Sequence, residues 1–227
     1  MKQASSIFNK KQREQIEKAV IAAESSTSCE IVPIVGTVSG NYDRSEDMIG
    51  LWFAAFSAVG VWLMLPLQLS EPGSWAGRSV LGGGLFMLAV VFLAFITGVV
   101  IANRVAWMKR WFTPRKQMQK QVEARARELF FDNRVHHTSG GTGLLIYLSL
   151  FESKAVVFGD QEILDKLGQK FLDQLCLQLT TELQQRHPAD AMCQVIAEAG
   201  RQLSTLLPRA EGDVNELQDA LVLIDEE

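Results

Sequence analysis

The chain has 227 residues, 48% of them hydrophobic, and its 22 Lys and Arg against 26 Asp and Glu give a formal net charge of −4. Two long uncharged stretches leave about 170 residues outside them, which suffices for one modest domain and excludes two independent cores. The three cysteines lie far apart without a Cys-x-x-Cys spacing, so they predict reduced thiols in a cytosolic domain.

Residues 9–24 are predicted to form the first helix. Asn9 is its expected N-cap, Gln12 completes a capping-box pattern, and apolar residues then recur on one face. Residues 30–36 (EIVPIVG) have the β-branched content of a strand. Pro33 within it implies an edge position or a local bulge, because proline cannot donate to a ladder.

The two uncharged stretches, residues 48–70 and 79–103, follow a polar connector. Each is longer than the roughly 20 helical residues that cross a hydrocarbon core. The alternative, two buried helices of a soluble protein, seldom produces such length without a charge. We therefore predict a transmembrane hairpin, inserted after the first strand and joined by residues 71–78. Neither span has an ionisable residue in its interior, which excludes a single-chain transporter or channel.

Small residues recur at four-residue spacing on both predicted spans. In an antiparallel hairpin the two series lie at matching depth, where they would let the helix backbones approach closely. Small residues are common in any span, so chance alignment remains the alternative. The series are Gly50, Ala54 and Ala58 on the first span, and Ala94, Gly98 and Ala102 on the second.

The charges beside the second span predict its orientation. Eight Lys or Arg and one acid, Glu123, lie between residues 104 and 127, whereas the loop between the spans has one basic residue. The positive-inside rule therefore places both termini in the cytoplasm of a bacterial inner-membrane protein. Position beside a span favours anionic lipid headgroups over nucleic acid as the partner of these basic residues. The expected membrane-interface residues are Trp107, Lys109, Arg110 and Trp111, with Trp75 at the opposite interface.

A second series of elements follows the hairpin. Thr113 and Pro114 are expected to start a helix with one apolar face. Residues 143–150 (GLLIYLSL) and 155–158 (AVVF) predict a tight β-hairpin, whose first strand is apolar enough to be buried on both faces.

The last third of the chain is predicted to be helical. Asp160 is the expected cap of a helix that Gly168 interrupts, and residues 187–188 (His-Pro) predict a stop. Asp190 then caps the last main helix, which extends to about residue 206. The acidic tail beyond Pro208 is expected to be loosely held, with one helical turn around residues 217–221.

These elements predict an α/β fold, a small mixed β-sheet flanked by helices. Residues 1–47 and 104–208 would form one domain on one side of the membrane, interrupted by the hairpin at 48–103, and residues 209–227 would be the acidic tail. The sheet closes only if the strand at residues 30–36 returns beside that at 143–150. Both halves must then share one side of the membrane, in agreement with the charge argument.

Residues 124–163, with the strand and turn GLLIYLSLFE and the exit AVVFGDQEI, resemble the TPM domain family, and residues 27–32 (TSCEIV) resemble its first strand. The chain is most similar to the bacterial membrane-bound branch, whose members have two spans at this place and often accompany LemA-type proteins. Two positions depart from the family pattern: Pro33 in the first strand, and Glu162 where glycine is commoner.

The resemblance implies two candidate activities, a divalent-metal-dependent phosphatase and calcium binding. The candidate metal ligands are Glu30, Glu152 and Asp160, with Ca²⁺ or Mg²⁺ as the cofactor. Calcium takes six to eight oxygen ligands, and three separated carboxylates supply only part of them. The structural alternatives are a solvated strand end for Glu30, a turn residue for Glu152 and a helix cap for Asp160.

Other motifs carry less chemistry. His136 and His137 are expected in an extended segment, where neighbours point to opposite sides and do not chelate one ion. The Ser-Gly-Gly at residues 139–141 lacks the ending of a P-loop. We therefore expect a non-enzymatic module that binds another protein in the assembly or maintenance of membrane proteins. A membrane-anchored, metal-dependent phosphatase is the alternative.

Overall fold

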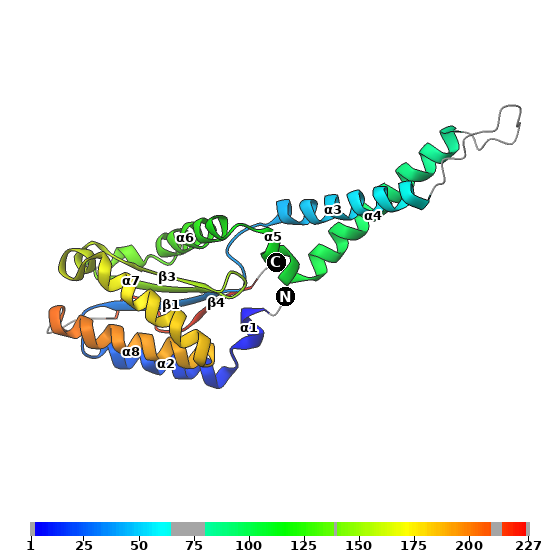
Figure 1. Ribbon diagram of the computed structural model, residues 1–227. Coiled ribbons are helices and arrows are strands. Elements are labelled where there is room, and N and C mark those ends of the chain that lie inside the picture. Colours follow the sequence, from blue (N-terminus) through cyan, green and yellow to red (C-terminus); the bar gives the residue numbers. More distant parts are fainter. Residues whose placement is uncertain (1–2, 65–79, 139, 210–214, 226–227) are drawn as a thin grey trace, which may run out of the picture. The chain divides into compact units, whose positions relative to one another are not determined.

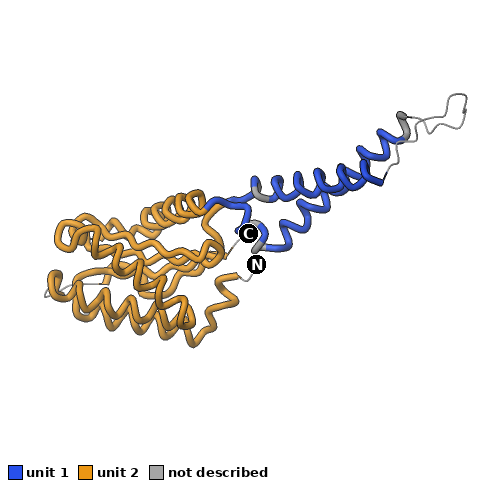
Figure 2. The backbone as a smooth tube through the Cα atoms, viewed as in Figure 1, with its two compact units in different colours: residues 1, 41–114 blue, residues 2–40, 115–227 orange. Residues whose placement is uncertain are grey.

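The structure is a computed structural model that describes residues 3–64, 80–138, 140–209 and 215–225. The chain forms two compact units, one over Asn41–Pro114 and the other from Lys2–Gly40 together with Arg115–Glu227 (Figure 2). The second unit is thus made of two segments that the first unit interrupts in sequence.

A four-stranded mixed sheet is the centre of the second unit (Figure 1). Its strands are β1 (Glu30–Gly36), β2 (Gly143–Ser149), β3 (Lys154–Gly159) and β4 (Val222–Ile224), in the order β3-β2-β1-β4. β1 lies beside β2 and β3 forms an antiparallel hairpin with β2, as the sequence predicts, and the pairing of β1 with β2 is parallel. Every residue of β1 and β2 is buried.

Helices cover both faces of this sheet. Alternate residues of β1 explain the layering, because Ile31 and Val35 belong to one apolar core whereas Val32 and Ile34 belong to the other. The first core is closed by α2 (Lys10–Glu24), α7 (Gln161–Gln185) and α8 (Pro188–Leu206). The second is closed by α6 (Arg115–Asp132). The α/β fold with a mixed sheet flanked by helices is therefore confirmed.

Several local predictions are confirmed as well. Asn9 caps α2 in a capping box with Gln12, and Gly168 interrupts α7 with φ 70° and ψ 170°, a left-handed φ that favours glycine. Pro33 lies opposite Ile146 of β2, and β4 pairs only with the three residues of β1 that follow Pro33. The proline therefore occupies a part of β1 beside which β4 does not extend.

Two expectations about local structure after the hairpin are wrong. His187, not Asp190, is the N-cap of α8, and its side chain accepts a hydrogen bond from the amide of Ala189. The predicted stop at residues 187–188 is confirmed, because α7 ends at Gln185. Pro188 is itself the first residue of α8, since proline suits a position whose amide has no intrahelical partner. His136 and His137 lie in the short 3-10 helix η1 (Val135–His137), not in an extended segment.

The tail also differs from the prediction. Residues 222–224 form β4, which pairs in parallel with Ile34, Val35 and Gly36. The amide of Thr37 continues this pairing by donating to the carbonyl of Ile224 at 2.9 Å. The expected helical turn around residues 217–221 is absent from the described residues 215–225. The apolar Val-Leu-Ile sequence instead covers the exposed edge of β1.

The first unit contains the two long apolar helices, α3 (Asp43–Met64) and α4 (Val80–Arg104), followed by the short α5 (Ala106–Phe112). Both long helices carry windows that are apolar enough to cross a membrane, and only 11% of each window is buried. The predicted loop at 71–78 and the end of the first span at 65–70 lie outside the described residues.

The two helices are in close contact at a pair of glycines. A Cβ atom on Gly98 would lie 2.9 Å from the Cα of Gly50, and one on Gly50 would lie 2.7 Å from a methyl group of Val99. Of the other small residues in the predicted series, Ala102 is buried and Ala54, Ala58 and Ala94 are half-buried.

Candidate functional site

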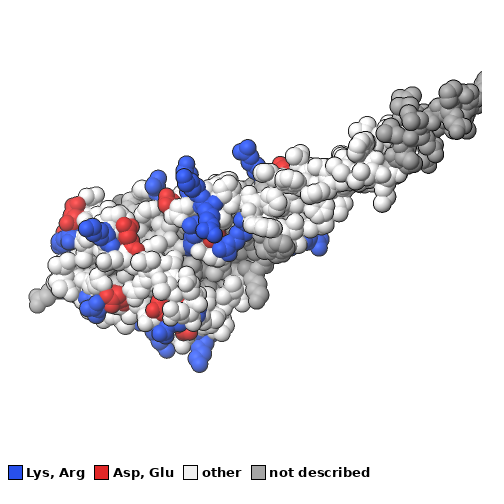
Figure 3. Space-filling model, in the orientation of Figure 1, with Lys and Arg blue, Asp and Glu red and all other residues white. Residues whose placement is uncertain are grey.

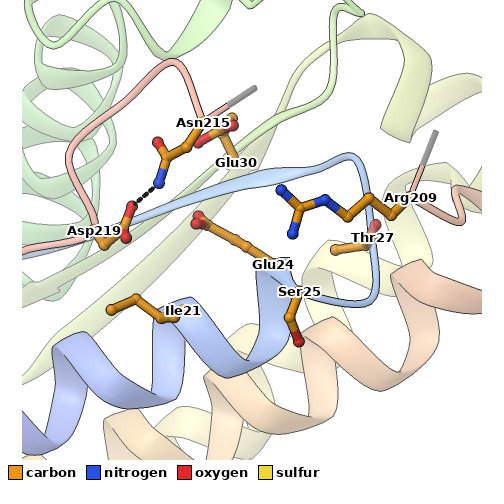
Figure 4. A pocket seen from close by; sticks show the side chains of 8 residues that line it. All are labelled: Ile21, Glu24, Ser25, Thr27, Glu30, Arg209, Asn215 and Asp219. Carbon is orange, nitrogen blue, oxygen red and sulfur yellow. Dashed lines mark hydrogen bonds between the residues drawn. The ribbon is translucent and has the colours of Figure 1, made fainter. Parts of the chain in front are cut away.

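A pocket of about 180 Å³ lies where the end of α2, the start of β1 and the segment before β4 meet (Figure 4). The turn between α2 and β1 is held in place by Thr27, whose buried hydroxyl donates to the carbonyl of Leu207 at 2.6 Å. Because α2 ends at Glu24 and β1 begins at Glu30, this short turn brings two carboxylates to the same wall. The pocket is lined by Ile21, Glu24, Ser25, Thr27, Glu30, Arg209, Asn215 and Asp219.

Three of these side chains, Glu24, Glu30 and Asp219, each offer an oxygen within 4.8 Å of the others. Among the residues that the structure describes, this is the one group of three or more Asp, Glu, His or Cys side chains close enough to bind the same ion. Asp219 is oriented by Asn215, whose amide nitrogen donates to it at 2.6 Å. Glu30 in turn accepts from the amide of Glu216 at 3.2 Å, so its carboxylate fastens the segment before β4.

Crowding and burial change the protonation of Glu24. Burial raises the pKa of its carboxyl group to about 8, and the neighbouring charges of Glu30 and Asp219 act in the same direction. The amide of Ile31, which donates to Glu24 at 2.7 Å, opposes this increase because it stabilises the ionised form. Near neutral pH the cluster therefore holds a proton on Glu24.

A cation could take the place of this proton. Calcium binds oxygens at 2.3–2.6 Å, so ligands on opposite sides of the ion lie about 5 Å apart, which suits the span of this cluster. Magnesium, with ligands at 2.0–2.1 Å, would need the oxygens to move closer. The cluster could thus supply three of the six to eight oxygens that calcium takes, and Arg209 contributes the positive charge on the pocket wall.

Comparison with known proteins gives a match of fold. The NMR structure of the BA42 protein from the psychrophilic bacterium Bizionia argentinensis sp. nov. superposes with a TM-score of 0.58, covering 98% of this chain and 99% of that chain. The two sequences are 16% identical, so the likeness concerns the fold alone. No protein-family model matches the chain, and no curated protein matches it.

Of the three predicted metal ligands, only Glu30 belongs to the cluster. Glu152 lies at the opposite end of the sheet, since it follows Ser149 of β2, whereas Glu30 pairs with Gly143 at the other end of that strand. Six residue steps along a strand correspond to about 20 Å. The structure therefore does not bring Glu30 and Glu152 together.

Glu152 is a buried acceptor that organises its own surroundings. Its side chain is 2% exposed and accepts from the amide of Ser39 at 2.9 Å and from the hydroxyl of Ser149. The hydroxyl of Ser39 also shares a hydrogen bond of 2.9 Å with that of Tyr147. These bonds fasten the chain after β1 to the end of β2.

Asp160 is the N-cap of α7, as its structural alternative predicts, and its carboxylate accepts from the amide of Gln161 at 2.8 Å. Its own amide donates to the carbonyl of Gly143, so it lies at the same end of the sheet as Glu30. However, Asp160 follows β3 and Glu30 begins β1, and β2 lies between these two strands.

The histidines and the membrane-interface residues occupy helical segments. His136 packs against Phe131 with ring centroids 4.8 Å apart, and both side chains are exposed. Arg110 and Trp111 are exposed on α5, with Trp111 at 80%. The side chains of Trp107 and Lys109 and the whole of Trp75 lie outside the described residues.

Sequence reasoning missed Glu24 and Asp219. A signal for Glu24 exists, because an acid at the end of a helix and another at the start of the next strand are joined by only five residues. Asp219 has no such signal. Its position depends on β4 pairing with β1, a contact between segments almost 190 residues apart.

Proposed function

We propose that this protein is a two-span protein of the bacterial inner membrane whose α/β domain lies in the cytoplasm and binds another protein. The observation that carries the proposal is the exposure of two long apolar helices, each only 11% buried over its most apolar window. A helix that is apolar on all sides is stable when lipid or protein covers it. Such helices in the core of a soluble protein would be buried by their own chain.

The resemblance to the TPM domain family supports a role in the assembly or maintenance of membrane proteins, with a LemA-type protein as the candidate partner. The chemistry of the described nucleophiles favours binding over catalysis. Burial raises the pKa of the thiols of Cys176 and Cys193, which lowers their thiolate content. The hydroxyl of Ser149 is fully buried and donates to Glu152.

Membrane fractionation tests the proposal. We expect the full chain to stay with the membrane after alkaline carbonate extraction. A variant with Phe56→Lys and Leu93→Lys, at sites that are 69% and 63% exposed, should become extractable because it places two charges on the lipid-facing surfaces. The matched control is Leu177→Lys, at an exposed site of α7. Extraction of the unmodified chain would contradict membrane insertion.

The second candidate function is a membrane-anchored, divalent-metal-dependent phosphatase, and the carboxylate cluster at Glu24, Glu30 and Asp219 is the observation that favours it. Calcium or magnesium held there would supply Lewis-acid chemistry toward a phosphate ester. The residues of this chain would orient the ion: Asn215 through its bond to Asp219, and the turn at Thr27 by fixing Glu24 relative to Glu30.

Calorimetry on the detergent-purified full chain separates the two candidates. Ca²⁺, Mg²⁺ and Mn²⁺ are titrated in turn, and hydrolysis of a phosphate monoester is assayed with each ion. Binding and hydrolysis that are both lost in Asp219→Asn would support the phosphatase, whereas binding without hydrolysis would support the protein-binding module. Asp160→Asn is the control, since it removes an equal charge at a helix cap.

A further inference from the structure

We propose that the outer face of α6 binds the phosphate groups of anionic lipid headgroups at the membrane surface. The face consists of Lys116, Lys120 and Arg127, and we call it the basic stripe. The proposal rests on the membrane anchoring proposed above and adds a second, reversible contact between the α/β domain and the membrane. Figure 3 shows basic side chains gathered where Figure 1 places α6.

Helical periodicity aligns the basic stripe. At about 100° per residue, the three side chains lie within roughly 40° of one another around the helix axis. All three are exposed, and none forms an ion pair with any residue that the structure describes. Three unpaired cations therefore point in one direction from a single helix.

The acids of α6 offset only part of the charge of this stripe. Glu128 forms an ion pair of 2.7 Å with Arg125. Glu123 lies on the same side of α6 as the stripe by the same periodicity, and its bond of 2.7 Å from the uncharged side-chain amide of Gln119 leaves its charge in place. Asp132 is exposed but lies more than 90° away from the stripe by the same periodicity. Three cations beside one acid leave the stripe with a net positive charge for an external partner.

The opposite face of α6 fixes the direction of the stripe. Met118, Val122, Ala126, Leu129 and Phe130 are all buried, and the last four belong to the core beneath the sheet. Rotation of α6 that removed the basic residues from the surface would expose this apolar face. The stripe is therefore a rigid feature of the α/β unit.

An exposed aromatic pair extends the stripe and favours lipid as the occupant. Phe131 follows Arg127 by four residues, is 54% exposed and packs on the ring of His136 with centroids 4.8 Å apart. A membrane interface accommodates aromatic rings beside cationic side chains. A free phosphate ion would leave these rings in water.

The covalent path between α4 and α6 is short. One residue, Val105, separates α4 from α5, and two residues, Thr113 and Pro114, separate α5 from α6. With about 1.5 Å per helical residue and about 3.3 Å per extended residue, the start of α6 can lie no farther than roughly 25 Å from the end of α4. If α4 crosses the bilayer, this chain length keeps the stripe within reach of the headgroups.

The expected strength follows from surface electrostatics. Each basic side chain near an anionic leaflet favours the bound state roughly fivefold, so the net of two positive charges that Glu123 leaves on this side of α6 gives on the order of 25-fold. Salt weakens the contact, because the Debye length falls from about 10 Å at 0.1 M to about 3 Å at 1 M.

Chemical footprinting of the full chain in liposomes tests whether the basic stripe binds anionic lipid. A membrane-impermeant amine reagent is applied to vesicles of neutral phosphatidylcholine, with or without anionic phosphatidylglycerol, and acylation of each lysine is measured by mass spectrometry. We expect the acylation of Lys116 and Lys120 to slow at least threefold in the anionic vesicles and to recover in high salt. Lys10, Lys11 and Lys170, exposed on α2 and α7, serve as internal controls.

A variant distinguishes docking of the stripe from a general effect of surface charge. Arg127→Gln should reduce the protection of Lys116 and Lys120, whereas Arg13→Gln, at an exposed site on α2, should leave it unchanged. Equal acylation in neutral and anionic vesicles would overturn the proposal. So would protection by an added acidic polypeptide in neutral vesicles without protection by anionic lipid, which would assign the stripe to a protein partner.

The same vesicles separate this proposal from the membrane anchoring on which it rests. If alkaline carbonate removes the chain from the vesicles, the proposal of membrane anchoring is wrong, and so is the proposal of lipid binding by the stripe, which rests on it. If the chain stays inserted and the two lysines react equally in both lipid compositions, only the lipid-binding stripe fails.

Discussion

The carboxyl group of Glu24 has a raised pKa because of its surroundings in the folded protein. Its pKa of about 8 lies above the ordinary value of 4.5 because the group is largely buried beside Glu30 and Asp219. A pKa that is raised in the folded state means that the folded protein binds the proton more tightly than the unfolded chain does. The resulting stability is fully present below pH 4.5 and is lost as the pH rises through 8.

Glu24→Gln should remove this pH dependence. Glutamine keeps an oxygen that can accept from Ile31 but cannot ionise, so the variant gains stability over the unmodified protein as the pH rises from 5 to 9. We expect a difference of about 1–2 kcal/mol after allowance for solvent screening. Thermal unfolding in detergent at the two pH values measures it.

Glu17→Gln is the control for Glu24→Gln, because it removes a charge from an exposed position of the same helix. Its effect should be the same at pH 5 and pH 9. Parallel pH profiles for Glu24→Gln and the unmodified protein would show that Glu24 ionises normally in the folded state.

Two helix caps show which side-chain hydrogen bonds can be predicted from the neighbouring sequence alone. The side chain of Asn9 and that of Asp160 accept bonds from amides three residues and one residue later, so their partners lie within the local sequence. Both caps were predictable. The raised pKa of Glu24 and the position of Asp219 were not, because the burial of Glu24 and the third carboxylate come from segments that meet only in the folded domain.

At the scale of an element, the hairpin of α3 and α4 depends on the close approach of two backbones. Gly98→Leu should weaken the hairpin by about 1–3 kcal/mol, because even its Cβ would lie 2.9 Å from the Cα of Gly50 and from the Cβ of Phe53. The melting temperature of the detergent-solubilised protein measures the effect.

Gly84→Leu is the matched control on the same helix, since a Cβ there would meet no described atom within 4 Å beyond the adjacent backbone of its own helix. It should leave the melting temperature nearly unchanged. If both variants melt at the temperature of the unmodified protein, the glycine contact does not stabilise the hairpin.

β4 is the element that converts an acidic tail into part of the sheet. β4 pairs with β1, and the next residue, Asp225, accepts hydrogen bonds from the amide of Ser5 at 3.1 Å and from the hydroxyl of Thr37 at 3.2 Å. Hydrogen bonding from the side chain of Ser5, together with these bonds from the Ser5 amide and Thr37, keeps the pKa of the Asp225 carboxyl below its usual range. The tail strand therefore connects β1 with the N-terminal helix α1 (Ala4–Ile7).

Removing residues 222–227 should destabilise the α/β unit by about 2–3 kcal/mol, since the apolar contacts of β4 and its backbone bonds are lost together. Hydrogen exchange gives a specific readout, because the amide of Thr37 donates to Ile224 and should lose its protection. Removal of residues 226–227 alone should leave that amide protected. Unchanged exchange at Thr37 after the longer deletion would show that β4 is not formed in solution.

At the scale of the whole molecule, the α/β unit is built from two segments on either side of the hairpin. Parallel pairing of β1 with β2 joins Glu30–Gly36 to Gly143–Ser149, across the interruption. Both segments must therefore lie on the same side of any membrane that the hairpin crosses. The excess of basic residues after α4 favours the cytoplasm for that side.

A topology experiment checks this orientation. A reporter fused after Glu227 should behave as cytoplasmic, and a tag inserted at Gly73 should be accessible from outside the cell. The same reporter fused after Gly40 in a chain that ends there provides a second cytoplasmic reference. An external reporter at Glu227 together with an internal tag at Gly73 would reverse the orientation.

The sequence by itself determined the apolar helices, the capped helix α2, the β2–β3 hairpin and the α/β class. Each follows from a short-range cause: residue periodicity, a cap, a tight connection or an uninterrupted apolar run. Only the tertiary structure decided the fourth strand and the carboxylate cluster. The strand β4 is stable only when it pairs with the edge of β1. The same pairing brings Asp219 close to Glu24 and Glu30.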